Sequence, residues 1–154
     1  PFRRLGAHAA SMMSAHVVYP ALDPHHPATL SRTIASDLLR GELGFGGVLF
    51  SDDLEMQAIA ARGALGAAAV DAVRAGCDVL LVCSKPAMQA EVCAALLEAH
   101  ARDAGFARRC REAAYRSLAL RLAYPSRPGT LEQLASLIES ELDPLGAELA
   151  RRVA

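Results

Sequence analysis

The sequence predicts an α/β fold in which parallel strands alternate with helices. Three short apolar segments each precede a segment with helical periodicity, which is the pattern of βαβ units. The chain has 154 residues, is 53% hydrophobic and carries a formal net charge of −1, so it can bury such strands on both faces. This composition excludes extensive disorder. With no basic run and no apolar segment of about 20 residues, it also argues against a nucleic-acid or membrane partner.

The first strand is expected at residues 11–19, an apolar and partly β-branched segment that a proline ends. A loop rich in proline, aspartate and histidine follows at 20–27. The first helix is expected to begin at Thr29 or Ser31, because both hydroxyls are good N-caps, and to run to Arg40.

The second strand is expected at residues 46–50, and the polar segment 51–53 follows it directly. The alanine-rich segment 57–75 has the pattern of one helix, weakened by Gly63 and closed by Gly76. These elements form the second strand–helix unit.

The third strand is expected at residues 78–83. Ser84 as N-cap and Pro86 at the first helical position then predict a helix that ends near Asp103, and a further helix spans 106–123. Three strands leave both edges of a parallel sheet open, so we expect this chain to be a piece of a larger fold unless further strands escape recognition.

The last part of the chain is predicted to be helical. Residues 124–129 contain two prolines and a glycine, and Thr130 with Gln133 fits a capping box at the start of a helix. We therefore divide the chain into residues 1–123 and a helical extension, 124–154.

Functional side chains in parallel α/β folds lie at the carboxyl ends of the strands. Asp52 and Asp53 follow the second strand, where two adjacent carboxylates are costly to desolvate unless something uses them. One could serve as a nucleophile or base, or both could be solvated acids at a helix start. His16 lies near the end of the first strand, as a core residue or a site residue.

Two other groups are interpreted as structural. The four cysteines lack metal-site spacing, and their apolar neighbours predict reduced core thiols: Cys77, Cys83, Cys93 and Cys110. The arginines at 108, 109 and 111 are expected to form a solvated helix face.

Three segments resemble the bacterial β-N-acetylhexosaminidases of glycoside hydrolase family 3. They are Ala15-His16-Val-Val-Tyr-Pro20, the Leu-Gly-Phe-x-Gly-Val-x-Phe-Ser-Asp-Asp-Leu string at 43–54, and Ala75-Gly-Cys-Asp-Val-Leu-Leu-Val-Cys83. The resemblance implies that the fold is part of a (β/α)8 barrel, comprising its later strand–helix units, and that residues 1–123 are the carboxyl-terminal portion of the catalytic domain.

The resemblance also implies roles for individual residues. Asp52 matches the family's catalytic nucleophile, which forms a glycosyl-enzyme intermediate in a retaining mechanism. Asp53 and Ser51 are then supporting residues, and His16 is a possible contact to the sugar. The family's acid/base histidine lies in a Lys-His-x-Pro-Gly-His-Gly segment, which this sequence does not contain. No metal and no cofactor is implied.

The implied activity is removal of terminal β-linked N-acetylglucosamine, from muropeptides in cytoplasmic cell-wall recycling, with a carbohydrate as the only implied partner. Without the acid/base segment, we expect this chain to be inactive alone. Three alternatives remain open: a family 3 β-glycosidase of the β-glucosidase kind, magnesium-dependent phosphoryl transfer at Asp52 and Asp53, and a non-catalytic α/β binding domain.

Overall fold

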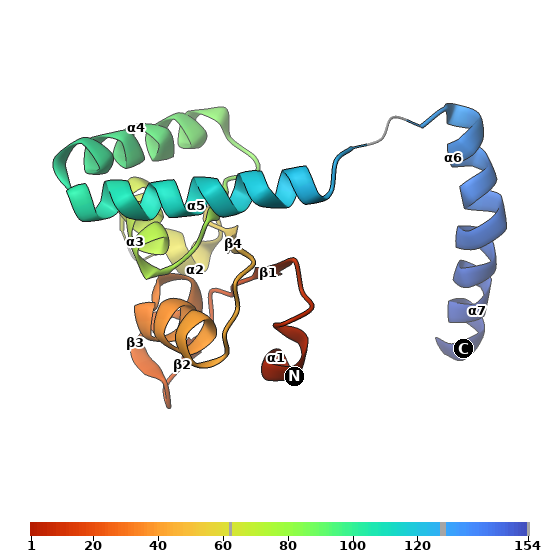
Figure 1. The fold of residues 1–154 in the computed structure, drawn as a ribbon, viewed down its shortest axis with the longest axis horizontal. Coiled ribbons are helices and arrows are strands. Elements are labelled where there is room, and N and C mark those ends of the chain that lie inside the picture. Colours follow the sequence, from red (N-terminus) through yellow and green to blue (C-terminus); the bar gives the residue numbers. More distant parts are fainter. Residues whose placement is uncertain (62, 127–128, 154) are drawn as a thin grey trace. The chain divides into compact units, whose positions relative to one another are not determined.

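A computed structural model describes residues 1–61, 63–126 and 129–153. The chain forms two compact units, Pro1–Ala123 and Tyr124–Ala154, each of which is described by itself. Figure 1 shows the elements in chain order.

The first unit is organised around three parallel strands: β1 (Ser11–Met13), β4 (Val48–Asp53) and β5 (Val79–Leu81). Their order is β1-β4-β5, so β4 is central. Met12 lies opposite Leu49 on one side of β4, and Phe50 lies opposite Val79 on the other. The parallel arrangement confirms the α/β fold class.

The segment between β1 and the first helix differs from the prediction of one strand and a loop. Only Ser11–Met13 joins the sheet, while β2 (Val18–Tyr19) and β3 (Asp23–Pro27) form a separate antiparallel hairpin. The chain leaves the main sheet because residues 15 and 17 bond to the next segment: the Thr29 N–H donates to the Ala15 carbonyl at 3.3 Å, and the Ala28 N–H to the Val17 carbonyl at 2.9 Å.

Seven helical elements belong to this unit: α1 (Phe2–Leu5), η1 (Ala28–Leu30), η2 (Thr33–Glu42), α2 (Gln57–Ala60), α3 (Leu65–Ala75), α4 (Pro86–Arg102) and α5 (Ala104–Ala123). The N-cap position of η2 is Arg32 and not Thr29 or Ser31 as predicted, although the Ser31 hydroxyl just before it accepts the Ile34 N–H at 3.2 Å. The prediction of one helix over 57–75 is wrong, since Gly63 has φ +135° and separates α2 from α3.

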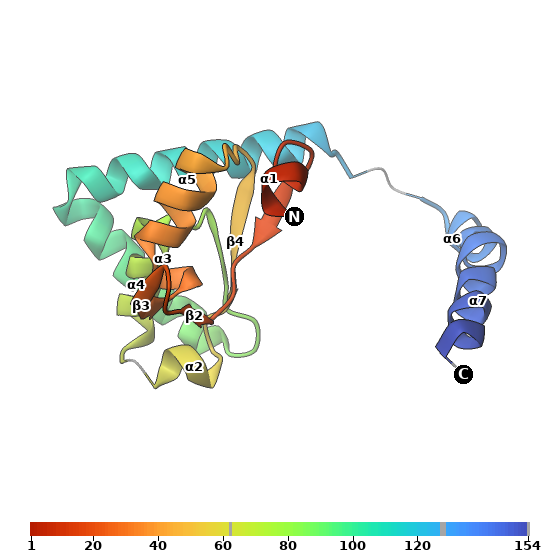
Figure 2. The ribbon, with the colours of Figure 1, turned by 90° about the horizontal axis from the view of Figure 1, so that it is seen from below.

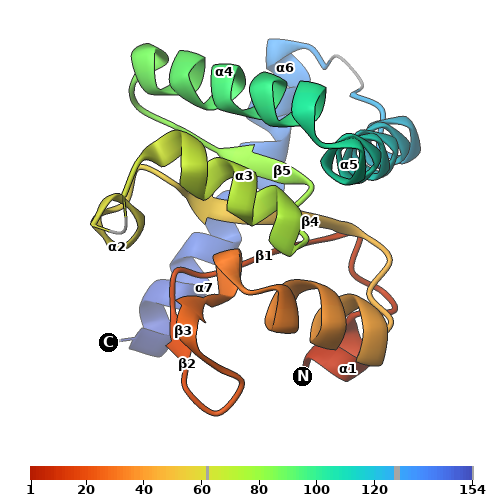
Figure 3. The ribbon, with the colours of Figure 1, turned by 90° about the vertical axis from the view of Figure 1, so that its left-hand side faces the viewer.

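Helix α3 lies between α4 on one side and η2 on the other and also contacts β5 (Figure 3). Its alanines and glycine allow this close packing: Ala69 and Ala72 are fully buried, and a Cβ at Gly66 would come within 2.7 Å of the Ala95 Cβ. Figure 2 shows α5 passing the amino end of β4, while α2 lies at its carboxyl end.

Two buried clusters of side chains hold the strands to these helices. One contains Phe45, Leu49 and Cys77 with alanines of η2 and α3, and the other contains Leu54 and Val92 with residues of α3. Both clusters include residues of β4 or of its immediate flanks. A third cluster contains Val70, Val73 and Phe106, and Leu80 of β5 packs against all three.

The second unit contains α6 (Leu131–Leu137), η3 (Ile138–Leu142) and α7 (Asp143–Val153). The predicted capping box is confirmed, because the Gln133 N–H donates to Thr130 Oγ1 at 3.1 Å and the Thr130 N–H donates to Gln133 Oε1 at 2.9 Å. Among the described residues, none of the helices combines the length and apolar character needed to span a membrane.

Candidate active site

The polar segment at 51–53 belongs to β4 itself and does not follow the strand as predicted. Phe50 pairs with Val79, and Asp53 pairs with Leu81. Between these two pairs β4 advances by three residues and β5 by two, so the register of the strands shifts. Ser51 is fully buried at this irregularity, and its Oγ accepts the Leu81 N–H at 2.9 Å. Its hydroxyl therefore gives the Leu81 N–H a side-chain acceptor where the register of the two strands shifts.

Asp52 is half-buried at the carboxyl end of β4. Its Oδ1 accepts the N–H of the next residue, Asp53, at 2.8 Å. Among the described residues this N–H is the only donor bound to the Asp52 carboxylate, and no described cation pairs with it. One hydrogen bond fixes the orientation of the carboxylate while leaving most of its acceptor capacity available.

Asp53 has different contacts, several of which hold the backbone. Its Oδ1 accepts the Glu55 N–H at 3.1 Å, and its carbonyl oxygen accepts a hydrogen bond from His16 Nε2 at 2.9 Å. These bonds shape the turn after β4, and a supporting role of Asp53 in catalysis stays a prediction.

His16 connects this turn to a buried hydroxyl. Its Nδ1 lies 2.9 Å from Oγ1 of Thr29, a fully buried residue, and that Oγ1 lies 2.9 Å from the Ser14 Oγ. A carbonyl only accepts, so His16 Nε2 carries the proton; Nδ1 of the neutral ring then accepts from Thr29, and Thr29 accepts from Ser14. Both ring nitrogens thus have protein partners, and contact of His16 with a sugar stays a prediction.

Glu55 joins the loop after β4 to the loop after β5. Its carboxylate accepts the Ser84 N–H at 2.6 Å, the Ser84 hydroxyl at 2.5 Å and the Lys85 N–H at 3.0 Å. The Ser84 hydroxyl, followed by these backbone N–H groups, holds the pKa of Glu55 below its usual value. Ser84 is not the N-cap of α4 as predicted; Lys85 occupies that position, with Pro86 after it.

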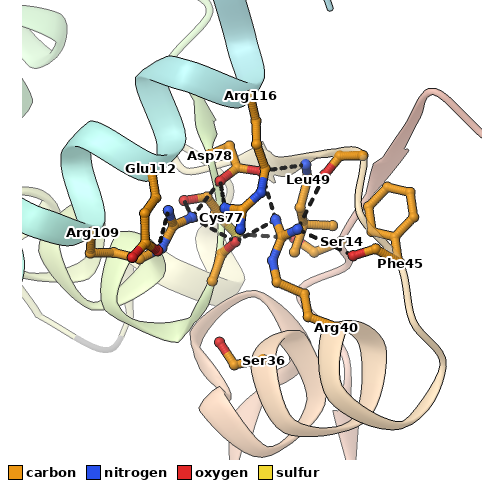
Figure 4. Close-up of polar contacts among 12 residues, drawn as sticks. Ser14, Ser36, Arg40, Phe45, Leu49, Cys77, Asp78, Arg109, Glu112 and Arg116 are labelled. Carbon is orange, nitrogen blue, oxygen red and sulfur yellow. Dashed lines mark hydrogen bonds and ion pairs between the residues drawn. The ribbon is translucent and has the colours of Figure 1, made fainter. Parts of the chain in front are cut away.

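Three arginines surround one buried carboxylate at the opposite, amino end of the sheet (Figure 4). Asp78 is 0% exposed; its Oδ2 accepts from Arg40 at 2.6 Å, and its Oδ1 accepts from Arg109 at 2.5 Å and from Arg116 at 3.1 Å. The Leu49 N–H donates to the same carboxylate at 3.0 Å. The side chain of Arg109 is only 16% exposed, so the predicted solvated face is wrong at this position.

The four cysteines differ in solvent exposure. The prediction of core thiols is wrong for Cys83 and Cys93, which are exposed. Cys77 is buried, and burial raises the pKa of its thiol to about 11. Its Sγ donates to the Thr29 carbonyl at 3.7 Å. Cys83 lies beside the candidate site, where partial removal of water and then the charge of Asp53 raise the pKa of its thiol.

These features define a class of protein: a parallel α/β domain whose candidate carboxylate lies at the carboxyl end of a central strand, the position of functional residues in (β/α)8 enzymes. Residues 1–116 match the family model described as the glycosyl hydrolase family 3 N terminal domain. The chain belongs to glycosyl hydrolase family 3, which confirms the resemblance.

Two relatives show over how much of the chain the sequence similarity extends. A beta-hexosaminidase of Aromatoleum aromaticum is 53% identical over 87 residues, which are 56% of this chain and 24% of that protein. A beta-hexosaminidase of Pseudomonas aeruginosa is 37% identical over 142 residues, which are 92% of this chain and 41% of that protein. The chain therefore spans less than half the length of these relatives.

Solved structures confirm that the fold is part of a barrel-type domain. The β-N-acetylhexosaminidase of Beutenbergia cavernae is 40% identical with a TM-score of 0.71, over 75% of this chain and 34% of that one. A glycoside hydrolase family 3 β-N-acetylglucosaminidase of a Paenibacillus species is 38% identical with a TM-score of 0.76, over 84% and 25%.

The structure brings together three of the four residues singled out from the sequence at one hydrogen-bonded turn. Asp52 bonds the backbone of Asp53, whose carbonyl binds His16, and Ser51 secures the strand just before them. Two further residues of the site, Glu55 and Thr29, are not indicated by the sequence. The hydroxyl of Thr29 before a helical segment predicts an N-cap, and nothing in the local sequence around Glu55 indicates partners near residue 84.

Proposed function

We propose that this chain is part of a retaining exo-β-N-acetylglucosaminidase in which Asp52 is the nucleophile. The observation that carries the proposal is the half-buried Asp52 carboxylate, oriented by one backbone N–H at the carboxyl end of the central strand. The solved relatives described as β-N-acetylhexosaminidase and β-N-acetylglucosaminidase support the choice of sugar.

In the proposed reaction an Asp52 oxygen attacks the anomeric carbon of the terminal sugar. The bond from that carbon to the leaving oxygen breaks as the ester to Asp52 forms, and the leaving oxygen takes a proton from a general acid. Water then attacks the same carbon, gives its proton to that group, and releases Asp52 as a carboxylate. The negative charge of Asp52 also stabilises the oxocarbenium character of both transition states.

The proton-transfer group is not among the residues of this turn. His16 is bound through both nitrogens to a carbonyl and to Thr29, and the Lys-His-x-Pro-Gly-His-Gly segment is absent from the sequence. Because general acid–base catalysis contributes typically about 10²–10⁴-fold, we propose that this chain alone does not hydrolyse glycosides. The activity belongs to an enzyme that contains both segments.

Muropeptides in the cytoplasm are the proposed source of the substrate, on the ground of the resemblance to the hexosaminidases. A family 3 β-glucosidase-like enzyme is the second candidate, because the nucleophile turn is compatible with any β-linked sugar. The Ser-Asp-Asp-Leu sequence at 51–54 and the names of the relatives favour N-acetylglucosamine.

The test is covalent trapping in an enzyme that carries this chain together with the acid/base segment. A 5-fluoro-N-acetylglucosaminyl fluoride should add to the peptide that contains Asp52, as located by mass spectrometry. Asp52→Asn should abolish both labelling and turnover, whereas the matched variant Asp53→Asn should still be labelled. Labelling of a different residue would contradict the mechanism, and faster turnover of aryl glucosides than of aryl N-acetylglucosaminides would contradict the substrate.

A further inference from the structure

Two hollows lie side by side along α5 at the amino end of the sheet. One has a volume of about 750 Å³ and lies between α5 and η2; the other has a volume of about 510 Å³ and lies between α5 and the turn before β4. Arg108, Glu112 and Arg116 line both hollows, so this part of α5 forms the ridge between them.

Positive charge is in excess along this ridge. Five of the arginines that line the hollows belong to this side, and among the described residues their ion pairs involve only two carboxylates, Asp78 and Glu112. The arginines are Arg40, Arg108, Arg109, Arg111 and Arg116. The far wall of the larger hollow is different, because Arg74 is paired there with Asp71 and Asp103. The excess charge is therefore located on the α5 side.

Several donors on this side have no acceptor within the described part of the chain. The buried atom Arg40 Nε has no hydrogen-bond partner, and Arg109 Nη1 has only the Glu112 carboxylate at 3.8 Å. The exposed side chains of Arg108 and Arg111 form no ion pair with a described residue. Burial lowers the pKa of Arg40; the Asp78 carboxylate opposes this effect, and the charges of Arg116 and Arg109 add to it. A bound anion would supply the exposed Arg108 and Arg111 with acceptors and would offset the repulsion between the guanidinium groups.

We propose that this ridge binds the phosphoryl group of a small phosphorylated ligand. The binding side chains are Arg108, Arg111, Arg116 and Tyr115, whose positive charge outweighs that of the single carboxylate on the ridge, Glu112. A phosphoryl group presents several oxygens and up to two negative charges, which suits guanidinium groups that approach from more than one direction. Tyr115 is 75% exposed on the smaller hollow and offers a hydroxyl and a ring to the rest of the ligand. Asp52 lies at the other end of β4, so this ligand would not compete with the proposed sugar substrate.

The double variant Arg108→Ala/Arg111→Ala tests the proposal without disturbing Asp78, which neither residue contacts. The matched control is Arg3→Ala/Arg102→Ala, which removes the same charge from exposed positions outside both hollows. Pyrophosphate, inorganic phosphate and a sugar phosphate are titrated into the 154-residue chain at constant ionic strength. Binding is followed by thermal shift and by isothermal calorimetry.

We expect saturable binding to the wild-type chain and to the control, and at least a tenfold weaker affinity in the ridge variant. Tighter binding of the sugar phosphate than of inorganic phosphate would assign the site to an organic phosphate, and the reverse order would assign it to free phosphate. The absence of saturable binding, or an equal loss in both double variants, would overturn the proposal. None of these measurements depends on glycosidase activity.

Discussion

Substitution of Asp78 with asparagine should destabilise the first unit more than any other change of one carboxylate to its amide. The carboxylate is 0% exposed and accepts hydrogen bonds from three guanidinium groups and the Leu49 N–H. Asparagine has a similar shape, but it carries no charge and places an NH₂ where an arginine donor now points.

The magnitude follows from what the variant leaves behind. Three partly buried arginines would lose their shared anion, and removal of one partner from a buried ion pair typically costs about 3–5 kcal/mol. The total stability of a domain of this size is commonly about 5–15 kcal/mol, so Asp78→Asn should leave the protein only marginally folded at 25 °C.

Urea denaturation followed by circular dichroism measures this loss, with Asp103→Asn as the control. The Asp103 side chain is 43% exposed and pairs with Arg74, and it accepts the Phe106 N–H at the start of α5. Asparagine keeps a good capping group, so the control should lose at most about 1 kcal/mol. If Asp78→Asn cost no more than the control, the arginine cluster would not be the stabilising centre inferred from its geometry.

Three further outcomes are expected. In an enzyme with the acid/base segment, His16→Gln keeps an N–H donor for the Asp53 carbonyl and should retain more of its kcat than His16→Ala, with KM little changed; equal losses would contradict a positioning role. Glu55 has a lowered pKa, so its contribution to stability is present above its ordinary pKa of 4.5 and is lost as the pH falls below it. Urea titrations should therefore show a shallower decline for Glu55→Gln than for the wild type between about pH 5 and pH 3; parallel curves would argue against the contact. Native thiol labelling should modify Cys93 well before Cys77, whose raised pKa and burial keep it protonated; the opposite order would contradict the buried site.

The sequence predicted the order of the elements well because those signals are local. The central strand, the helix that begins at Pro86 and the capping box at Thr130 each depend on residues within a few positions of one another. The segment 57–75 is an exception, because there the local signal predicted one helix and the structure has two. Its alanines predicted a helix, but the φ of Gly63 was decided by how the chain enters the packing between α4 and η2.

The contacts that shape the site are long-range, and no local pattern could indicate them. Glu55 binds residues 29 and 30 positions away, His16 binds a carbonyl 37 positions away, and Asp78 binds Arg116 38 positions away. Asp52 could be singled out only because adjacent carboxylates after an apolar strand are unusual and because the family motif surrounds it. Its single backbone donor became visible only with the fold.

The carboxylates at the two ends of β4 have opposite electrostatic environments. We therefore expect Asp78, at the amino end, to contribute to stability and Asp52, at the carboxyl end, to activity. At the amino end, Asp78 is saturated with donors and removed from water, so its charge is available only to the protein. At the carboxyl end, one N–H among the described residues holds Asp52, which keeps the acceptor capacity that the proposed attack on the anomeric carbon would need. A nucleophile surrounded by three guanidinium groups would be a weak one, because every ion pair that stabilises its charge also lowers its basicity. The Asp52 turn is instead fixed through neighbours that bind the backbone, namely His16, Ser51 and Glu55, which hold the position of the carboxylate without neutralising it.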